Sequence, residues 1–386
     1  MAIYKRKSGR YAVLIDVDRA ADGKRKRRPL GTFRTRKEAE RAEREALASR
    51  DRGYDLSPQT LTVGQLFGRY LLDNKARISP KTHERYEELA VRNVLPTLEA
   101  LPLAKLRPAH LASLYAQLLE NGRANGVGGL SARTVGHVHT LVHGALAWAV
   151  RMELVGRNVA DAVRPPKAVR PEAKALAVDE AQRLLAHAKE TRFGPLFAVA
   201  IATGARRGEL CALRWDAVDL ERATMTIRTS VSKTRAGFCE KGTKSGKVRT
   251  VSLSPLAIEA FRARRVRQAQ DRLAAGGAYE SAGYVFADAL GGRISPDVVT
   301  REFYQFARRV GLSTTSFHSL RHTAATWMIG GGVDVRTAAS VLGHASPNVT
   351  LAVYSHLIAG AQAVAVATID DRLLGIAPVR DRKEAT

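Results

Sequence analysis

The stretch HSLRHTAATWMIGGGVDVRTAASVLGHASPNVTLAVY, residues 318–354, sets the main expectations for this chain. Its first half reads as a helix in which His318 and Arg321 are three residues apart, so both side chains fall on one face. The glycine run that begins at Gly330 ends this helix.

Two more short helices are expected in the same stretch. Val335–Leu342 fits one helix, with Gly343 as its natural C′ residue. Ser346-Pro347 is a cap followed by a first-turn proline and opens the other. Three short helices joined by tight turns bring four polar side chains toward one point: His318, Arg321, His344 and Tyr354.

This set of side chains suits one kind of chemistry. Cationic and imidazole donors stabilise negative charge on phosphate oxygens, and a phenol close to them is a candidate nucleophile. The stretch therefore predicts a site that holds a phosphodiester while a tyrosine attacks it.

Two upstream segments extend the pattern. Residues 203–210 read TGARRGEL and place Arg206 near the start of a helix, and residues 244–253 read KSGKVRTVSL, a basic turn followed by a short strand. Together with the first stretch, the ordered set Arg, Lys, His-x-x-Arg, His, Tyr resembles the tyrosine recombinase (phage integrase) family. The motifs cover roughly residues 172–360, and the whole chain is similar in layout.

The resemblance implies a role for each residue. Arg206 and Arg321 would clamp the phosphate, because guanidinium is always charged and forked to match two oxygens. The family motif selects Arg206, although Arg207 beside it is an alternative. Glu209 would orient an arginine or pack structurally, and it is not expected to be catalytic.

The remaining roles concern proton transfer and attack. Tyr354 would be the nucleophile, giving a 3′-phosphotyrosine and a free 5′-hydroxyl. Lys244 would protonate the leaving oxygen, with Lys241 and Lys247 as nearby competitors. His318 would act as base or hydrogen-bond partner, and His344 would donate to a non-bridging oxygen.

Bulk properties agree with a nucleic-acid partner. The chain has 386 residues, enough for two or three domains, and a net charge of +25 that favours a polyanion. No apolar run approaches the ~18 residues of a membrane span, and no signal peptide is apparent. Cys211 and Cys239 form no disulfide or metal pattern, so a reduced, cytoplasmic and nucleoid-associated protein is expected.

The N-terminal segment is expected to be a small basic module of three strands and a helix. Residues 1–36 hold 12 lysines and arginines against 3 aspartates. One interpretation is a solvated hairpin arm. The other is a sheet laid in a DNA groove, which resembles the arm-type DNA-binding domain of integrases. The candidate DNA contacts are Lys5, Arg6, Lys24, Arg25, Lys26, Arg27 and Arg28.

The predicted fold class is multidomain α+β. Residues 1–56 form the arm module, and 57–165 form a helical bundle similar to the core-binding (SAM-like) domain of the family. Residues 166–386 form an α-rich catalytic domain with a small sheet, and 166–175 is its linker. Within these domains, Ser79-Pro80 starts a helix to about Asn93, Ser131 caps another helix, 194–203 is expected to be a helix and 224–231 a strand. The apolar tail Leu357–Leu374 is a candidate helix for docking onto a neighbouring protomer or onto its own domain.

Metal and nucleotide sites are not expected. His139 and His143 are four residues apart, but no Cys, Asp or Glu nearby completes a metal site. Residues 242–248 fall one residue short of a phosphate loop. We expect no cofactor, no metal and no ATP.

The resemblance implies a site-specific recombinase that integrates or excises a phage or mobile element through a Holliday junction. Its expected partners are double-stranded attachment-site DNA, three further protomers in a homotetramer, a host DNA-bending protein and an excision factor, with no membrane. Two alternatives are a type IB topoisomerase-like enzyme, against which the second, N-terminal DNA site argues, and a catalytically silent DNA-binding regulator.

Overall fold

The computed structural model describes residues 2–6, 9–19, 25–51, 61–124, 126–168, 175–243, 246, 248–343 and 346. The chain divides into two compact units, residues 1–169 and 170–386. The fold is helix-rich with small sheets, as expected. Within the described residues, no helix is both long and apolar enough to cross a membrane.

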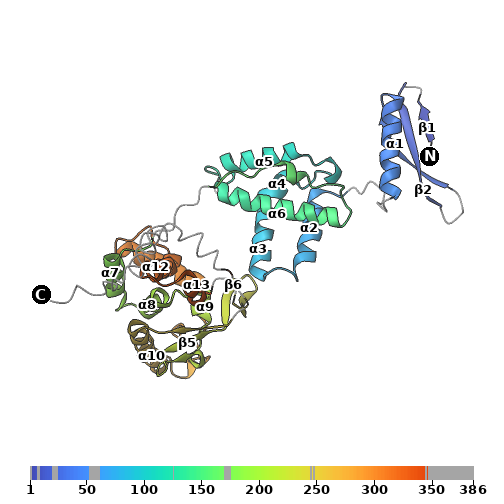
Figure 1. Cartoon of the computed structure of the whole chain (residues 1–386). Coiled ribbons are helices and arrows are strands. Elements are labelled where there is room, and N and C mark those ends of the chain that lie inside the picture. Colours follow the sequence, from blue (N-terminus) through green and yellow to red (C-terminus); the bar gives the residue numbers. More distant parts are fainter. Residues whose placement is uncertain are drawn as a thin grey trace, which may run out of the picture. The chain divides into compact units, whose positions relative to one another are not determined.

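The N-terminal segment holds an antiparallel sheet in the order β1-β2-β3 and one helix. Figure 1 shows α1 lying along this sheet. Val13 of β2 and Ala39 of α1 are buried. The bounds are β1 Ala2–Lys5, β2 Tyr11–Arg19, β3 Arg25–Phe33 and α1 Arg36–Asp51.

A helical bundle follows, and local signals in the sequence account for its helix starts. Thr62 and Gln65 form a reciprocal capping box at the start of α2, and Ser131 caps α6. Trp148 of α6 donates its indole N–H to Asp73 at 2.9 Å, which fastens α6 to α2. The helices are α2 Val63–Asn74, α3 Pro80–Leu89, α4 Leu95–Leu98, α5 Pro108–Asn121 and α6 Ala132–Arg151.

One part of the bundle departs from the expected pattern. The helix that begins at Pro80 was expected to stop near Asn93. Instead, a π-helical turn, Ala90–Val94, carries it into α4. Such turns accommodate one extra residue. Two short 3-10 turns, Leu103–Lys105 and Val159–Ala162, complete this region.

In the C-terminal unit, helices and two small sheets surround a large apolar core (Figure 1). Its helices are α7 Val178–Ala188, α8 Gly194–Thr203, α9 Arg207–Ala212, α10 Pro255–Ala275, α11 Pro296–Arg309, α12 Phe317–Gly330 and α13 Val335–Leu342. One sheet has the order β4-β5-β8, from Val218–Asp219, Thr224–Ile227 and Arg249–Ser252, and β6 Thr229–Thr234 pairs with β7 Gly237–Gly242 as a hairpin.

The sheets correct one expectation. A single strand was expected over 224–231, but the chain leaves the first sheet after Ile227 and starts the hairpin at Thr229. The hairpin rests on α9, where a Cβ on Gly208 would lie only 2.6 Å from the carbonyl oxygen of Val231. This close packing separates the two strands.

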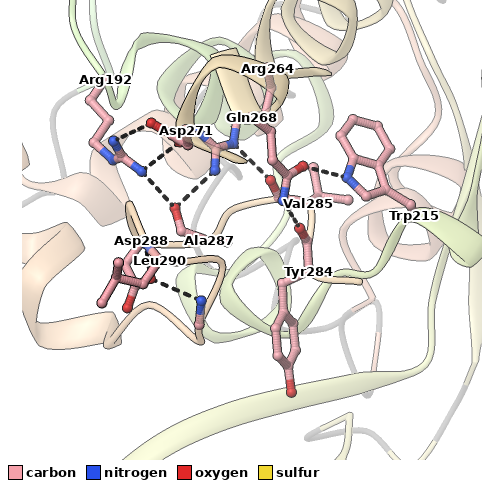
Figure 2. Close-up of polar contacts among 11 residues, drawn as sticks. Arg192, Trp215, Arg264, Gln268, Asp271, Tyr284, Val285, Ala287, Asp288 and Leu290 are labelled. Atoms are coloured by element: carbon pink, nitrogen blue, oxygen red, sulfur yellow. Dashed lines mark hydrogen bonds and ion pairs between the residues drawn. The ribbon is translucent and has the colours of Figure 1, made fainter. Parts of the chain in front are cut away.

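A buried arginine holds the loop 284–288 against α10. Arg264 is 2% exposed and donates to the carbonyls of Val285 at 2.8 Å and Ala287 at 2.9 Å. Asp271 lies between Arg264 and Arg192, as Figure 2 shows. We call these three charged residues the Asp271 network.

Candidate active site

Arg206 occupies the N-cap of α9. The preceding helix α8 ends at Gly204, whose left-handed φ of 63° turns the chain. Arg206 then adopts an extended backbone, and Glu209 accepts its N–H at 2.8 Å, which satisfies a donor at the helix start. The Arg206 guanidinium also donates to Glu209 at 2.9 Å, so one carboxylate fixes both ends of this arginine.

Glu209 is itself held by a second arginine. Arg249, the first residue of β8, donates from Nη1 and Nη2 to the two carboxylate oxygens at 3.1 and 2.7 Å. Burial by itself would raise the pKa of Glu209, but the hydrogen bonds and charge of Arg249, together with the bonds from Arg206, hold that pKa below its ordinary value. We call Arg206, Glu209 and Arg249 the Glu209 network.

Aromatic packing positions the helix α12. Phe317, its first residue, contacts Phe197 of α8 and Phe303 of α11, with ring centroids 6.2 and 5.6 Å apart. Arg321 follows one turn later and is buried, donating to the carbonyls of Gly204 at 2.8 Å and Leu342 at 2.7 Å.

His318 lies one turn before Arg321 on α12 and remains exposed. Desolvation by the surrounding protein and the positive charges of Arg321, His322 and Arg206 lower the pKa of His318. The lowered pKa favours the neutral imidazole, whose unprotonated nitrogen can accept a proton.

Both predicted clamp arginines reach the end of α13. Arg206 donates from Nη2 to the carbonyl of Gly343 at 2.8 Å, next to the Leu342 carbonyl that accepts from Arg321. The structure thus brings Arg206 at the start of α9 together with His318 and Arg321 of α12, more than 100 positions later in the sequence. Two guanidiniums and a neutral imidazole can hold an anion and accept a proton beside it.

The side chain of Arg207, the alternative to Arg206, lies against α11 instead. It donates to the Thr300 hydroxyl and lies 3.9 Å from the carboxylate of Asp297, both on α11. Its position favours a packing role.

Several predicted residues lie outside the part of the chain that the structure describes. These are Lys244, its competitor Lys247, His344, Tyr354, the tail Leu357–Leu374 and the N-terminal Lys24. Lys241 is described and stands exposed near the end of β7.

The other predicted DNA contacts belong to the N-terminal sheet. Lys5 and Arg6 are exposed, at and just after the end of β1. The backbone of Arg25, Lys26, Arg27 and Arg28 lies in β3, paired with β2.

The histidines of α6 have local partners. His139 lies 3.2 Å from the Tyr115 hydroxyl, and His143 is 2.8 Å from a carboxylate oxygen of Asp161. Over the described ranges, no group of three or more His, Cys, Asp or Glu side chains is arranged to hold a metal ion.

Sequence reasoning missed Arg249. It lies in the quoted segment 244–253, but only Lys244 and its competitor Lys247 were named there. The available signal was its place as the first residue of a strand that follows a basic turn.

Comparison with known families divides the chain into three matched segments. Residues 174–360 match the phage integrase family, and residues 2–49 match an Arm DNA-binding domain. Residues 62–119 match the N-terminal SAM-like domain of phage integrases.

Curated proteins show similarity at greater length. A protein named tyrosine recombinase XerC-like from Caldanaerobacter subterraneus subsp. tengcongensis is 26% identical over 94% of this chain and 96% of its own length. Tyrosine recombinase XerD from Mycobacterium leprae is 31% identical over 64% of this chain and 77% of its own.

Solved structures agree on the fold. The Tn1549 transposon integrase, solved in complex with transposon right end DNA, superposes with a TM-score of 0.64 at 18% identity. The match covers 76% of this chain and 95% of that one.

Proposed function

Because the chain belongs to the tyrosine recombinase family, we propose that it is a site-specific DNA recombinase that cleaves and rejoins strands through Tyr354. One observation carries the assignment of the site. Arg206 and Arg321, from different helices, donate to the adjacent carbonyls of Gly343 and Leu342. Two permanent cations thereby bind the backbone of the two residues that precede His344 in the sequence.

In the proposed reaction, the phenol oxygen of Tyr354 attacks the scissile phosphorus and the bond to the 5′-oxygen breaks. The phenol proton passes to neutral His318, and Lys244 protonates the departing 5′-oxygen. Arg206, Arg321 and His344 stabilise the charge on the non-bridging oxygens. The phosphotyrosine bond conserves the phosphodiester's energy, so a 5′-hydroxyl can reverse the step without ATP.

The finer assignments follow from the same family membership. We propose three functional parts, namely an arm-type DNA-binding module at 1–56, a core-binding domain at 57–165, and a catalytic domain from 166 onward. The arm would engage DNA through Lys5, Arg6 and the 24–28 run, at a second site from the one that is cut. The assembly would be a tetramer on paired attachment sites of nucleoid DNA, passing through a Holliday junction with a bending protein and an excision factor.

The test is covalent trapping. The protein is mixed with nicked DNA carrying the flanking attachment sequence of its element, in EDTA and without ATP. We expect a protein–DNA adduct that resists SDS, and we expect Tyr354→Phe to abolish it while binding the same DNA.

The other outcomes discriminate between functions. Adducts and plasmid relaxation on any sequence would favour a topoisomerase-like enzyme. Tight binding without an adduct would favour a silent regulator, and an adduct that survives Tyr354→Phe would move the nucleophile to another tyrosine.

A further inference from the structure

Three arginines bind three consecutive carbonyls at the end of α13. The carbonyl of Val341 accepts from Arg249 at 2.9 Å, that of Leu342 from Arg321, and that of Gly343 from Arg206. The last carbonyls of a helix lack intrahelical donors and carry partial negative charge, which cations stabilise. Two of these arginines are the predicted clamp, and Arg249 has no assigned role.

Arg249 is enclosed in a way that suits holding other groups. All three of its guanidinium nitrogens donate to protein atoms, two to Glu209 and one to Val341, and its side chain is only 9% exposed. Arg206 shares the same carboxylate but keeps 24% of its side chain exposed. Of these two, Arg206 is the one able to turn toward a ligand.

The packing around Arg249 leaves no room for a side chain at Gly343. A Cβ built on Gly343 would lie 2.5 Å from Nη1 of Arg249, and the φ of 69° also favours glycine. The guanidinium therefore rests directly on the peptide whose carbonyl binds Arg206. A shift of Arg249 moves both supports of Arg206, the Glu209 carboxylate and the end of α13.

We propose that Arg249 is a positioning residue that aligns Arg206 for the scissile phosphate and fixes the end of α13 without touching DNA itself. The proposal rests on the proposed function. It also connects two parts of the site, since Arg249 begins β8 five residues after Lys244 and so anchors the end of the segment that carries the predicted acid.

The experiment compares single-turnover cleavage at saturating DNA with DNA affinity. We expect Arg249→Ala to slow cleavage about a hundredfold, as small misplacements of catalytic groups do, with unchanged affinity. Arg249→Lys keeps the charge but loses the fork, so it is also slow. The control is Arg222→Ala, which removes an 86%-exposed arginine from the turn between β4 and β5 and should cleave normally.

Chemical rescue separates positioning from general damage. Millimolar guanidinium chloride should restore part of the cleavage by Arg249→Ala, because the ion can occupy the vacated place between Glu209 and Val341. A variant slowed only by loss of stability would show no such recovery, since guanidinium does not strengthen apolar burial. If Arg249→Ala does not fold, the kinetics of Arg249→Lys decide the question.

The outcomes that would contradict the positioning role differ from the one that would contradict the proposed function. Cleavage at the wild-type rate by Arg249→Ala, or by a folded Arg249→Lys where the alanine variant does not fold, would overturn the proposal. So would a rate loss explained by weaker DNA binding. Absence of any adduct with the unsubstituted protein would refute the proposed function itself.

Discussion

The C-terminal unit contains two networks in which one carboxylate lies between two arginines, and they are built in opposite ways. In the Glu209 network, the carboxylate is the most buried member at 1% exposure, while Arg206 keeps 24%. In the Asp271 network, the cation Arg264 is the most buried at 2%, and Asp271 keeps 13%. The buried anion Glu209 positions a partly exposed cation, Arg206, whereas the buried cation Arg264 positions backbone carbonyls of a loop.

The difference separates function from stability. Arg264 directs its donors to Val285 and Ala287 in a loop of the fold (Figure 2). Arg206 directs one donor to Gly343, directly before the predicted catalytic residue His344. We therefore expect damage to the first network to lower activity and damage to the second to lower only the free energy of unfolding.

The largest effect is expected from Glu209→Ala. Both arginines lose their shared carboxylate, so Arg206 is no longer aligned, and the enclosed Arg249 and the partly exposed Arg206 are left in repulsion. Cleavage should fall about 100- to 1,000-fold, comparable to removing a preorganised donor from a transition state. Single-turnover adduct formation measures this rate. Near-normal cleavage would show that the Glu209 network is not needed for activity.

A smaller effect, on stability alone, is expected from Asp271→Ala. Breaking a buried ion pair leaves Arg264 without its charged partner and costs about 3 kcal/mol. Urea unfolding measures this loss. Below the unfolding transition, the folded variant should form adducts at the wild-type rate, and slowed cleavage there would mean that the two networks are coupled.

The smallest effect concerns pH. The pKa of Glu209 is lower in the folded protein than its unfolded value of about 4.3. Its charged form thus stabilises the fold above that value, and the stabilisation is lost as pH falls through the folded pKa. The difference in unfolding free energy between the wild type and Glu209→Gln should be constant near neutrality and narrow below about pH 4.

Urea titrations at several pH values between neutral and acid test this, and subtracting the variant removes the contribution of other carboxylates. A difference that stays constant through the acid range would show that Glu209 acts without its charge.

The helices were predictable because their boundaries are encoded locally. The predicted helix bounds of α8 and α13 are observed unchanged, since Gly204 and Gly343 mark their ends with left-handed φ angles. The N-caps Ser79 and Ser131 were likewise visible in the sequence. Such signals require only neighbouring residues.

The missed features depend on distant contacts. The break between β5 and β6 follows from packing against Gly208, which no local pattern reveals. Arg249 acquires its place from Glu209, 40 positions earlier, and Val341, 92 positions later. A basic residue at the start of a strand looks like any surface cation until these partners are known.

The arginine cluster at α13 can form only late in the synthesis of the chain. Its guanidiniums come from positions 206, 249 and 321, but their carbonyl partners are residues 341–343. During translation, each arginine is made before the carbonyl that holds it, so the cluster cannot assemble until the ribosome has passed residue 343. A nascent or prematurely ended chain therefore carries the proposed DNA-binding segments before it has an ordered cluster. If the proposed function holds, we expect such a fragment to bind DNA without cleaving it.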